Sequence, residues 1–353
     1  MKIAYEYLLN ESQLEKNIEW LLTKSSPSVV YLTNLNILKR RPDSKEMKEL
    51  WSKVLESPSS KELFGKQRED GSWYDGGSWP YRPTYMPKSG YTPVSPKYVT
   101  TAWLLTKLGE MGYTAKEPRI RKACEWLMEW QWQNGVLSEK KNAPPQLTGN
   151  PNPPNSPCRM SIQLEALAKV GFGTDIRLRK SWDLMLRWRR EDKGWIQNGH
   201  IDGTASPYKI WTRSCPYVSY FATSAFFFSR IPEYRKFAEE SLRFILWHMD
   251  QKEVQDLQRF FWHGHEPLKE LLMFSEIGFD HENKTIKDLL NWLKGMYEPD
   301  EACFRYKGKP YSKMNNREDG ATSRVMKYRM YHQAEEDWLT YYSTMIFNNF
   351  LIR

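Results

Sequence analysis

The sequence predicts one all-α domain built from repeated helix hairpins, and three observations lead to this fold class. One unit recurs along the chain: an apolar helix, a glycine followed by an aromatic residue, and a second helix that carries tryptophan. Leucine and tryptophan recur in the second helix at spacings of three and four, which is the period of a buried helical stripe. No acceptable domain boundary interrupts the series, so residues 1–353 are predicted to form a single domain.

The N-terminal residues 1–63 fit the repeat only loosely, and two or three helices are expected between Tyr5 and Leu63. From residue 64 onward the repeats are recognisable. The first helix, corner and second helix of the clearest copy are Thr100 to Leu108, Gly112-Tyr113, and Pro118 to Trp130. In the next copy, the first helix is Cys158 to Leu167, the corner is Gly171-Phe172 and the second helix is Asp175 to Trp188.

Two further copies follow. Cys215 to Phe228 and Tyr234 to His248 form a degenerate copy, in which residues 229–232 replace the glycine corner. The last copy has Leu271-Leu272 before Gly278-Phe279 and carries Trp292 in its second helix. A glycine at each corner is expected to end the first helix in the left-handed conformation, and the next aromatic residue to pack back onto that helix. Each hairpin alone leaves an apolar face, so neighbouring hairpins are expected to stack.

Two long, polar, proline-rich loops exceed the length of ordinary connections: residues 75–96 and 142–157. The first contains Trp79, Tyr81, Tyr85 and Tyr91, which would be wasted in a solvated flap. We therefore interpret these loops as covers at one mouth of a cavity.

Charge and composition narrow the partners. The chain has 52 Lys and Arg against 43 Asp and Glu, a net charge of +9, spread along the chain without a basic tail or a nucleic-acid motif of known spacing. This excess allows contact with an anionic membrane surface, and nucleic acid is not favoured. The 16 Trp, 20 Tyr and 15 Phe indicate a largely aromatic core or an aromatic-lined cavity, which suits a small apolar ligand.

Location follows from two features. The first ten residues mix charged and apolar side chains, unlike a signal peptide, and the longest apolar run, residues 221–228, is too short to span a bilayer. We therefore expect a cytoplasmic protein. Its four cysteines lie far apart without a CxxC pair and are expected to be reduced. The oligomeric state is open.

Two loop segments carry a family resemblance. Residues 67–73 have a glutamine followed by Gly-x-Trp, residues 131–137 end on leucine where tryptophan is expected, and residues 190–195 keep Gly-Trp but lack the glutamine. This pattern resembles the QW motif of squalene–hopene cyclases and related prenyltransferase-type proteins. The resemblance implies an α/α toroid, a barrel of helix hairpins around a central cavity. It also implies that Gln67 and Gln131 cap helix ends, with Trp73 and Trp195 as structural partners.

The chain departs from the family in its acid motifs. It contains neither Asp-x-Asp-Asp, with which these cyclases protonate an alkene, nor the Asp-Asp-x-x-Asp that binds diphosphate through magnesium. An Asp-x-Cys zinc segment of the protein prenyltransferase type is also missing, and the chain is about half the length that a two-domain triterpene cyclase has. The resemblance therefore predicts the architecture and the class of ligand more directly than the reaction.

Zinc is the one metal that the sequence suggests. Cys158 and His265 lie thirteen residues before Gly171 and Gly278, and Cys215 starts the repeat between them. Equivalent repeat positions lie at one height, so these three side chains could hold a catalytic zinc with an open position. His200, Asp202, His263 and Glu266 are candidates for a fourth ligand or for hydrogen bonds to the ligands. The alternative is that the cysteines are small buried fillers.

Carboxylates are the other catalytic candidates, because an acid in an aromatic cavity has a raised pKa and can donate a proton. The candidates are Asp70, Asp75, Asp202, Glu336 and Asp337. The alternative is that these acids cap helix starts. The predicted cavity residues are Tyr98, Trp211, Tyr217, Trp262, His263 and Tyr341, whose electron-rich rings would suit a cation.

The leading functional hypothesis is a terpenoid cyclase- or prenyltransferase-like protein that handles an isoprenoid-type ligand. The first alternative is a non-catalytic ligand-binding or interaction module on the same toroid. The second is a binder, hydrolase or lyase of an anionic polymer, which rests only on charge and on the range of chemistries that one fold can host. A deep apolar cavity favours the first two, and a groove lined with Arg and Lys favours the third.

Overall fold

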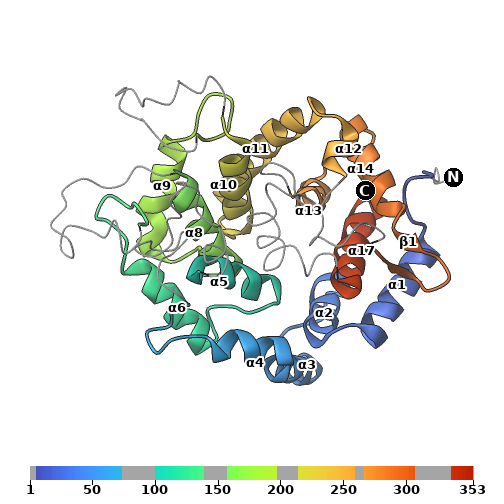
Figure 1. Cartoon of the computed structure of the whole chain (residues 1–353), viewed down its shortest axis with the longest axis horizontal. Coiled ribbons are helices and arrows are strands. Elements are labelled where there is room, and N and C mark those ends of the chain that lie inside the picture. Colours follow the sequence, from blue (N-terminus) through green and yellow to red (C-terminus); the bar gives the residue numbers. More distant parts are fainter. Residues whose placement is uncertain are drawn as a thin grey trace, which may run out of the picture. The chain divides into compact units, whose positions relative to one another are not determined.

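The computed structural model describes residues 5–73, 100–138, 157–196, 214–258, 266–306 and 335–352. Within these residues the secondary structure is helical except for two strands of two residues each (Figure 1). The all-α prediction is confirmed. None of the described helices combines the length and the apolar character that crossing a membrane requires.

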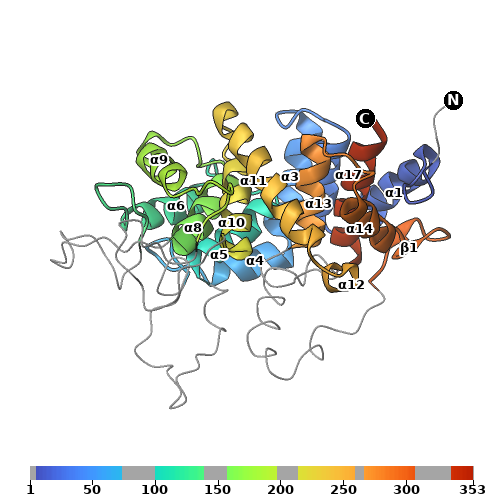
Figure 2. The ribbon, with the colours of Figure 1, turned by 90° about the horizontal axis from the view of Figure 1, so that it is seen from above.

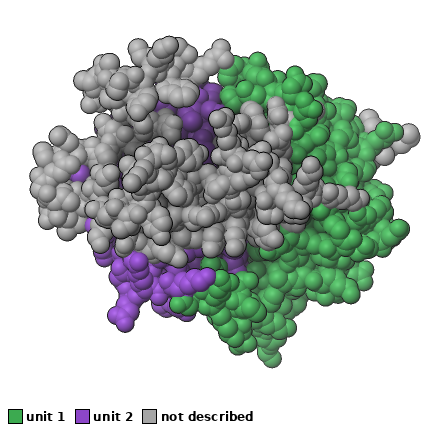
Figure 3. Space-filling model, in the orientation of Figure 1, with its two compact units in different colours: residues 1–65, 246–314, 329–353 green, residues 66–245, 315–328 purple. Residues whose placement is uncertain are grey.

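The chain forms two compact units, which Figure 3 colours separately. Unit 1 comprises residues 1–65, 246–314 and 329–353, and unit 2 comprises residues 66–245 and 315–328. The organisation as a single domain stays a prediction.

Unit 2 contains three consecutive helix hairpins. Their first helices are α5 (Thr101–Glu110), α8 (Pro157–Lys169) and α10 (Pro216–Phe228). Their second helices are α6 (Pro118–Met128), α9 (Arg179–Arg187), which follows a 3₁₀ turn at Ile176–Leu178, and α11 (Pro232–Asp250), whose last residues belong to unit 1. Helix α8 packs against both α5 and α10, while α6 and α9 lie on one side of the first helices (Figure 1).

Unit 1 is built around helix α17 (Glu336–Ile352), which packs against α1 (Glu11–Lys24), α2 (Pro27–Leu32) and α13 (Pro267–Ile277). Its other elements are a π-helix at Thr33–Ile37, α3 (Lys45–Glu56), α4 (Pro58–Gly65), α12 (Val254–Leu257), α14 (Lys284–Lys294) and the antiparallel strands β1 (Tyr297–Glu298) and β2 (Cys303–Phe304) (Figure 2). The N-terminal stretch thus holds four α-helices, where the sequence predicted two or three.

The hairpin corners have the predicted geometry. Gly112, Gly171 and Gly278 are left-handed, with φ of 96°, 75° and 94°. The backbone N–H of the next aromatic residue bonds to the carbonyl five residues earlier, with N···O distances of 2.8 to 3.0 Å. These two features together end a helix in a Schellman-type cap. At the corner between α10 and α11, which lacks a glycine, Arg230 is left-handed instead, with φ of 60°.

A tight turn precedes each hairpin of unit 2, and the first of these turns contains Gln67. The Gln67 amide donates to the carbonyl of Gly71 within the turn and to the carbonyl of Arg119 at the start of α6, both at 2.9 Å. The turn closes on Trp73, which is fully buried and whose backbone N–H donates to the Thr101 hydroxyl at 2.9 Å. Gln67 therefore ties the turn to a second helix, and Thr101 ties it to a first helix.

The second turn repeats these contacts. The Gln131 amide donates to the carbonyl of Arg177 and to the Ser181 hydroxyl, both at 2.9 Å. Ser181 in turn donates to the carbonyl of Gly135 at 2.6 Å. Gly135 is left-handed, with φ of 95°, and lies directly against the backbone of Lys180. The turn is thus held against the start of α9.

The third turn shows what replaces the missing glutamine. Arg189 donates to the carbonyls of Lys193 and Phe237, both at 3.3 Å, and to the Ser241 hydroxyl at 3.0 Å. These are the same kinds of partner that the glutamines have in the first two turns. The backbone N–H of Trp195 donates to Ser219 at 3.0 Å, as that of Trp73 does to Thr101.

A fourth turn of this kind, which was not predicted from the sequence, lies in unit 1. It joins β1 to β2, and Ala302 has the left-handed conformation, with φ of 56°. The backbone N–H of Phe304 donates to the Thr340 hydroxyl of α17 at 2.8 Å. A hydroxyl on a first helix thus receives the closing aromatic residue in both units.

Candidate functional site

The candidate acids that the structure describes all accept hydrogen bonds. Asp70 accepts from the backbone N–H and the hydroxyl of Ser72 at 2.9 and 2.7 Å. Burial acts to raise the pKa of Asp70, but these hydrogen bonds outweigh it, and the pKa lies below its ordinary value. Asp337 accepts from the backbone N–H groups of Ser26 and Trp338 at 2.9 and 2.8 Å. A proton donor needs a raised pKa, so the lowered pKa of Asp70 does not suit that role.

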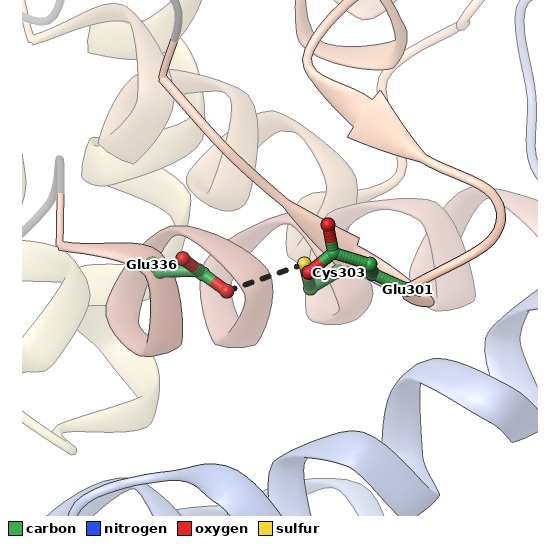
Figure 4. A group of neighbouring side chains, drawn as sticks. All are labelled: Glu301, Cys303 and Glu336. Atoms are coloured by element: carbon green, nitrogen blue, oxygen red, sulfur yellow. Dashed lines mark hydrogen bonds between the residues drawn. The ribbon is translucent and has the colours of Figure 1, made fainter.

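Glu336 belongs to a cluster at the start of α17. Ligand atoms of Glu301, Cys303 and Glu336 lie within 4.8 Å of one another, and no other metal-compatible trio of His, Cys, Asp or Glu occurs among the described residues (Figure 4). The Cys303 thiol donates to Glu336 with an S···O distance of 3.4 Å. The guanidinium of Arg305 donates to Glu301 at 2.9 and 2.8 Å, and to Glu336 at 3.2 and 3.1 Å.

This cluster fits a protein cation better than a metal ion. Burial, followed by the hydrogen bond to Glu336, raises the pKa of Cys303 to about 12, so forming the thiolate that zinc binds costs more here than at an exposed cysteine. The hydrogen bond from Arg305 lowers the pKa of Glu301, so this carboxylate is already ionised and paired. These contacts therefore hold β2 against α17.

The predicted zinc ligands do not form a metal-ligand group among the described residues. Cys158 is buried in the first turn of α8, and Cys215 is the N-cap of α10, where burial raises the pKa of its thiol. His265 lies outside the described residues, so the zinc site stays a prediction. Other candidates outside them are Asp75, Tyr98, His200, Asp202, Trp211, Trp262 and His263.

The two described cavity candidates lie in different units. Tyr341 of unit 1 is buried, and its hydroxyl accepts a hydrogen bond from Asn36 at 2.7 Å. Burial raises the pKa of Tyr341, so its hydroxyl stays protonated. Tyr217 of unit 2 is only half-buried. Of the two, Tyr217 is the ring that retains exposed surface for a ligand.

Tyr217 belongs to an aromatic cluster that joins two first helices. Its ring packs edge-on against Phe221, with centroids 4.7 Å apart, and Phe221 packs edge-on against Trp103 of α5 at 5.5 Å. Tyr220 adds a third edge contact to Phe221 at 5.2 Å. We call Trp103, Tyr217, Tyr220 and Phe221 the aromatic cluster. Edge-to-face pairs of this kind fix ring orientation.

A buried polar network lies on the same first helices. Lys169 of α8 contacts Glu110 of α5 at 2.5 Å and Glu165 at 3.2 Å, and Ser224 of α10 donates to Glu165 at 2.7 Å. The side chains of Lys169, Glu110 and Glu165 are 4%, 7% and 0% exposed, so water screens these charges little. We call these four residues the polar network. Buried charges persist when they are paired and hydrogen-bonded, as these are.

The aromatic cluster and the polar network share one face. Trp103 and Glu110 are two turns apart on one side of α5, and Phe221 and Ser224 are one turn apart on α10. Phe226 of α10 points the other way, because its ring contacts Trp182 of the second helix α9. We therefore define the inner face of unit 2 as the face of α5, α8 and α10 that carries the aromatic cluster and the polar network.

Sequence reasoning found Tyr217 but missed the rest of this face. Lys169 and Glu110 stand in the last turns of their helices, where charged residues are usually solvated. The signal that was missed is the constant spacing of equivalent positions in successive repeats. The bond from Lys169 to Glu110 and the bond from Ser224 to Glu165 both join residues 59 positions apart. Successive first helices thus present equivalent positions at that interval.

Comparisons with known proteins give structural similarity only. No protein-family model matches the sequence, and no curated protein matches it. Type II terpene cyclase MstE from Scytonema, in complex with its substrate geranylgeranyl dihydroxybenzoate, is 12% identical with a TM-score of 0.44, over 97% of this chain and 79% of that chain. In complex with its product merosterolic acid A, the same cyclase is 12% identical with a TM-score of 0.43, over 96% and 80%.

A protein from Actinoplanes is 14% identical, with a TM-score of 0.43, over 97% of this chain and 98% of that chain.

Proposed function

We propose that the chain is a terpenoid cyclase-like protein that handles an isoprenoid-type ligand on the inner face of unit 2. The observation that carries this proposal is the aromatic cluster, in which Trp103, Phe221 and the half-buried Tyr217 meet from two first helices. Oriented rings with one exposed member provide an apolar contact surface. Their electron-rich faces would also stabilise a cationic centre that forms in the ligand.

The turns of unit 2 support the same assignment. Gln67 and Gln131 each bond to the start of a second helix, which is the capping role that the QW resemblance implies. The closed ring of hairpins, the cytoplasmic location and the contact with a membrane surface stay predictions from the sequence.

The non-catalytic alternative is favoured by a specific observation. Asp70, Glu336 and Asp337 accept hydrogen bonds from Ser72, from Arg305 and from backbone N–H groups, so each of them already has a structural role. Asp75 and Asp202 lie outside the described residues and remain the other sequence candidates for an acid. If it is a ligand-binding module, the aromatic cluster is sufficient.

A binding assay tests the proposal. Titration of the chain with all-trans geranylgeraniol, followed by tryptophan fluorescence, should show saturable binding. Tyr217→Ala should weaken it about fivefold, because one aromatic contact contributes about 1 kcal/mol. Tyr234→Ala is the matched control, since Tyr234 is also half-buried but packs against Trp182 on the side of the second helices. Equal losses in the two variants, or no binding by the wild type, would refute the proposal.

The same protein separates an enzyme from a binder. Incubation with geranylgeraniol and with geranylgeranyl diphosphate, followed by mass spectrometry of the extracted lipids, should reveal a cyclised or transferred product if the chain is catalytic. Unchanged ligand in all incubations, together with saturable binding, favours the non-catalytic module.

A further inference from the structure

We propose that exposed bases at the starts of α6 and α9 bind the chain to an anionic membrane surface. This inference goes beyond the proposed function and does not depend on it, because these bases lie on second helices and not on the inner face. Four of them, Arg121, Lys122, Arg179 and Lys180, are called the basic strip.

The same pattern of five residues opens both helices. It reads Pro-Arg-Ile-Arg-Lys at residues 118–122 and Ile-Arg-Leu-Arg-Lys at residues 176–180. The third residue of each pattern is buried, and the other four are exposed. The two patterns are structurally equivalent, because Gln67 and Gln131 each donate to the carbonyl of the second residue. Each pattern thus exposes one apolar side chain beside three bases.

Helix stability does not account for these bases. The N-terminal end of a helix is the positive end of its dipole, which favours acids over bases. The joint between turn and second helix does not require them either. At the third joint, where Arg189 donates to the carbonyl of Phe237, the positions equivalent to Arg179 and Lys180 hold Glu239 and Glu240. The bases are therefore explained better by a partner than by the fold.

The charge of the basic strip is not paired within the part of the chain that the structure describes, where none of its four residues forms an ion pair. The bonds from Arg177, and less strongly the charge of Arg121, lower the pKa of Glu125 and Asp175. Both acids are already paired with Arg177, at 2.7 and 2.8 Å. These pairs join α6 to α9, so an anionic partner would meet the bases of two adjacent helices together.

The apolar residue of each pattern indicates the kind of partner. Ile176 is 76% exposed, and Pro118 is exposed at the equivalent position. A soluble polyanion would contact only the bases. An anionic membrane takes up an apolar side chain at its interface while its head groups attract the neighbouring bases. The repeated combination of an apolar residue and bases therefore favours the membrane.

Flotation with lipid vesicles tests the inference. Wild-type protein should bind phosphatidylcholine vesicles that contain about 30% phosphatidylserine, and should not bind pure phosphatidylcholine vesicles. Each base near such a surface strengthens binding about fivefold. Two double variants, Arg121→Gln with Lys122→Gln and Arg179→Gln with Lys180→Gln, should therefore each weaken binding at least about tenfold.

Two matched controls separate the basic strip from net charge and from general apolar exposure. Lys16→Gln with Lys24→Gln removes two exposed bases from α1 and should leave vesicle binding near the wild-type value. Ile176→Ser should weaken binding about tenfold, because it removes an inserted apolar side chain. Ile352→Ser should not weaken it, although Ile352 is 73% exposed.

Three outcomes would overturn the inference: wild-type protein that does not bind the phosphatidylserine vesicles, equal losses in the strip and α1 variants, or no loss in Ile176→Ser. In the last case, binding of soluble heparin would assign the basic strip to a polyanion instead. Thermal melts identify any variant that does not fold, and the two double variants change different helices. Geranylgeraniol binding should be unchanged in all of them, so the membrane inference and the proposed function fail separately.

Discussion

Replacing Gly135 by alanine should destabilise unit 2 strongly, because this glycine meets two requirements that alanine cannot. Its φ of 95° lies in the left-handed region, which side chains rarely adopt. A Cβ at this position would lie 2.5 Å from the carbonyl carbon and 2.6 Å from the carbonyl oxygen of Lys180. Both atoms are backbone, so they cannot swing aside as a flexible side chain would.

The magnitude follows from the two effects. A left-handed conformation costs an alanine about 1–2 kcal/mol, and forcing an extra methyl group into a packed contact costs about 1–3 kcal/mol. Gly135→Ala should therefore lower the free energy of unfolding by about 2–5 kcal/mol. The turn would also pull away from α9, which would weaken the bond of 2.6 Å between Ser181 and the carbonyl of Gly135.

Urea unfolding followed by tryptophan fluorescence measures the effect as a lower midpoint at an unchanged slope. Gly65→Ala is the matched control. Gly65 ends helix α4, has no heavy atom within 4 Å of an added Cβ, and should tolerate alanine or gain up to about 1 kcal/mol. A Gly135→Ala midpoint indistinguishable from wild type would show that the turn does not press on the second helix, and the argument from close approach would be wrong.

Three further predictions concern polar contacts. Arg189→Gln should cost less than about 1 kcal/mol of unfolding free energy, because glutamine fills this place in the other turns. Arg189→Ala should cost about 2 kcal/mol. Equal losses of the two variants in urea titrations would show that arginine does not take the place of glutamine in this turn. Lys169→Met should cost about 3–5 kcal/mol of unfolding free energy, because it leaves two buried carboxylates without their shared cation. Arg243→Met removes an exposed ion pair and should lie within about 0.5 kcal/mol of wild type. Similar values for both variants would argue against a buried network. Burial raises the pKa of Cys303 from 9.0 to about 12, so the folded state holds this proton more tightly than the unfolded state does. The stability that results is complete below pH 9 and is lost as the pH rises toward 12. Cys303→Ala should therefore lose less unfolding free energy than wild type between about pH 9 and about pH 12. An identical pH dependence of the two proteins would contradict this assignment.

The hairpins were predictable because their signals are local. Gly112, Gly171 and Gly278 mark the corners, and helix ends depend mainly on residues within one turn of them. The apolar period of each helix is local as well, so the all-α class followed from the sequence.

What the sequence could not reveal depends on partners distant in the chain. Arg189 takes the place of a glutamine only because Ser241 and Phe237 lie beside it in the fold. The fourth turn escaped notice because Ala302, rather than glycine, is left-handed there. The polar network was invisible for the same reason: a lysine in the last turn of a helix looks solvated until its glutamate, 59 residues away, is known to face it.

The closing bond of each turn has a consequence for how such a chain can grow. Thr101, Ser219 and Thr340 each receive the backbone N–H of an aromatic residue that ends the preceding turn. The same bond therefore recurs before α5, α10 and α17, on residues far apart in the chain. A hairpin that carries both the hydroxyl and a closing aromatic residue can be duplicated or lost without a new contact of this kind having to evolve.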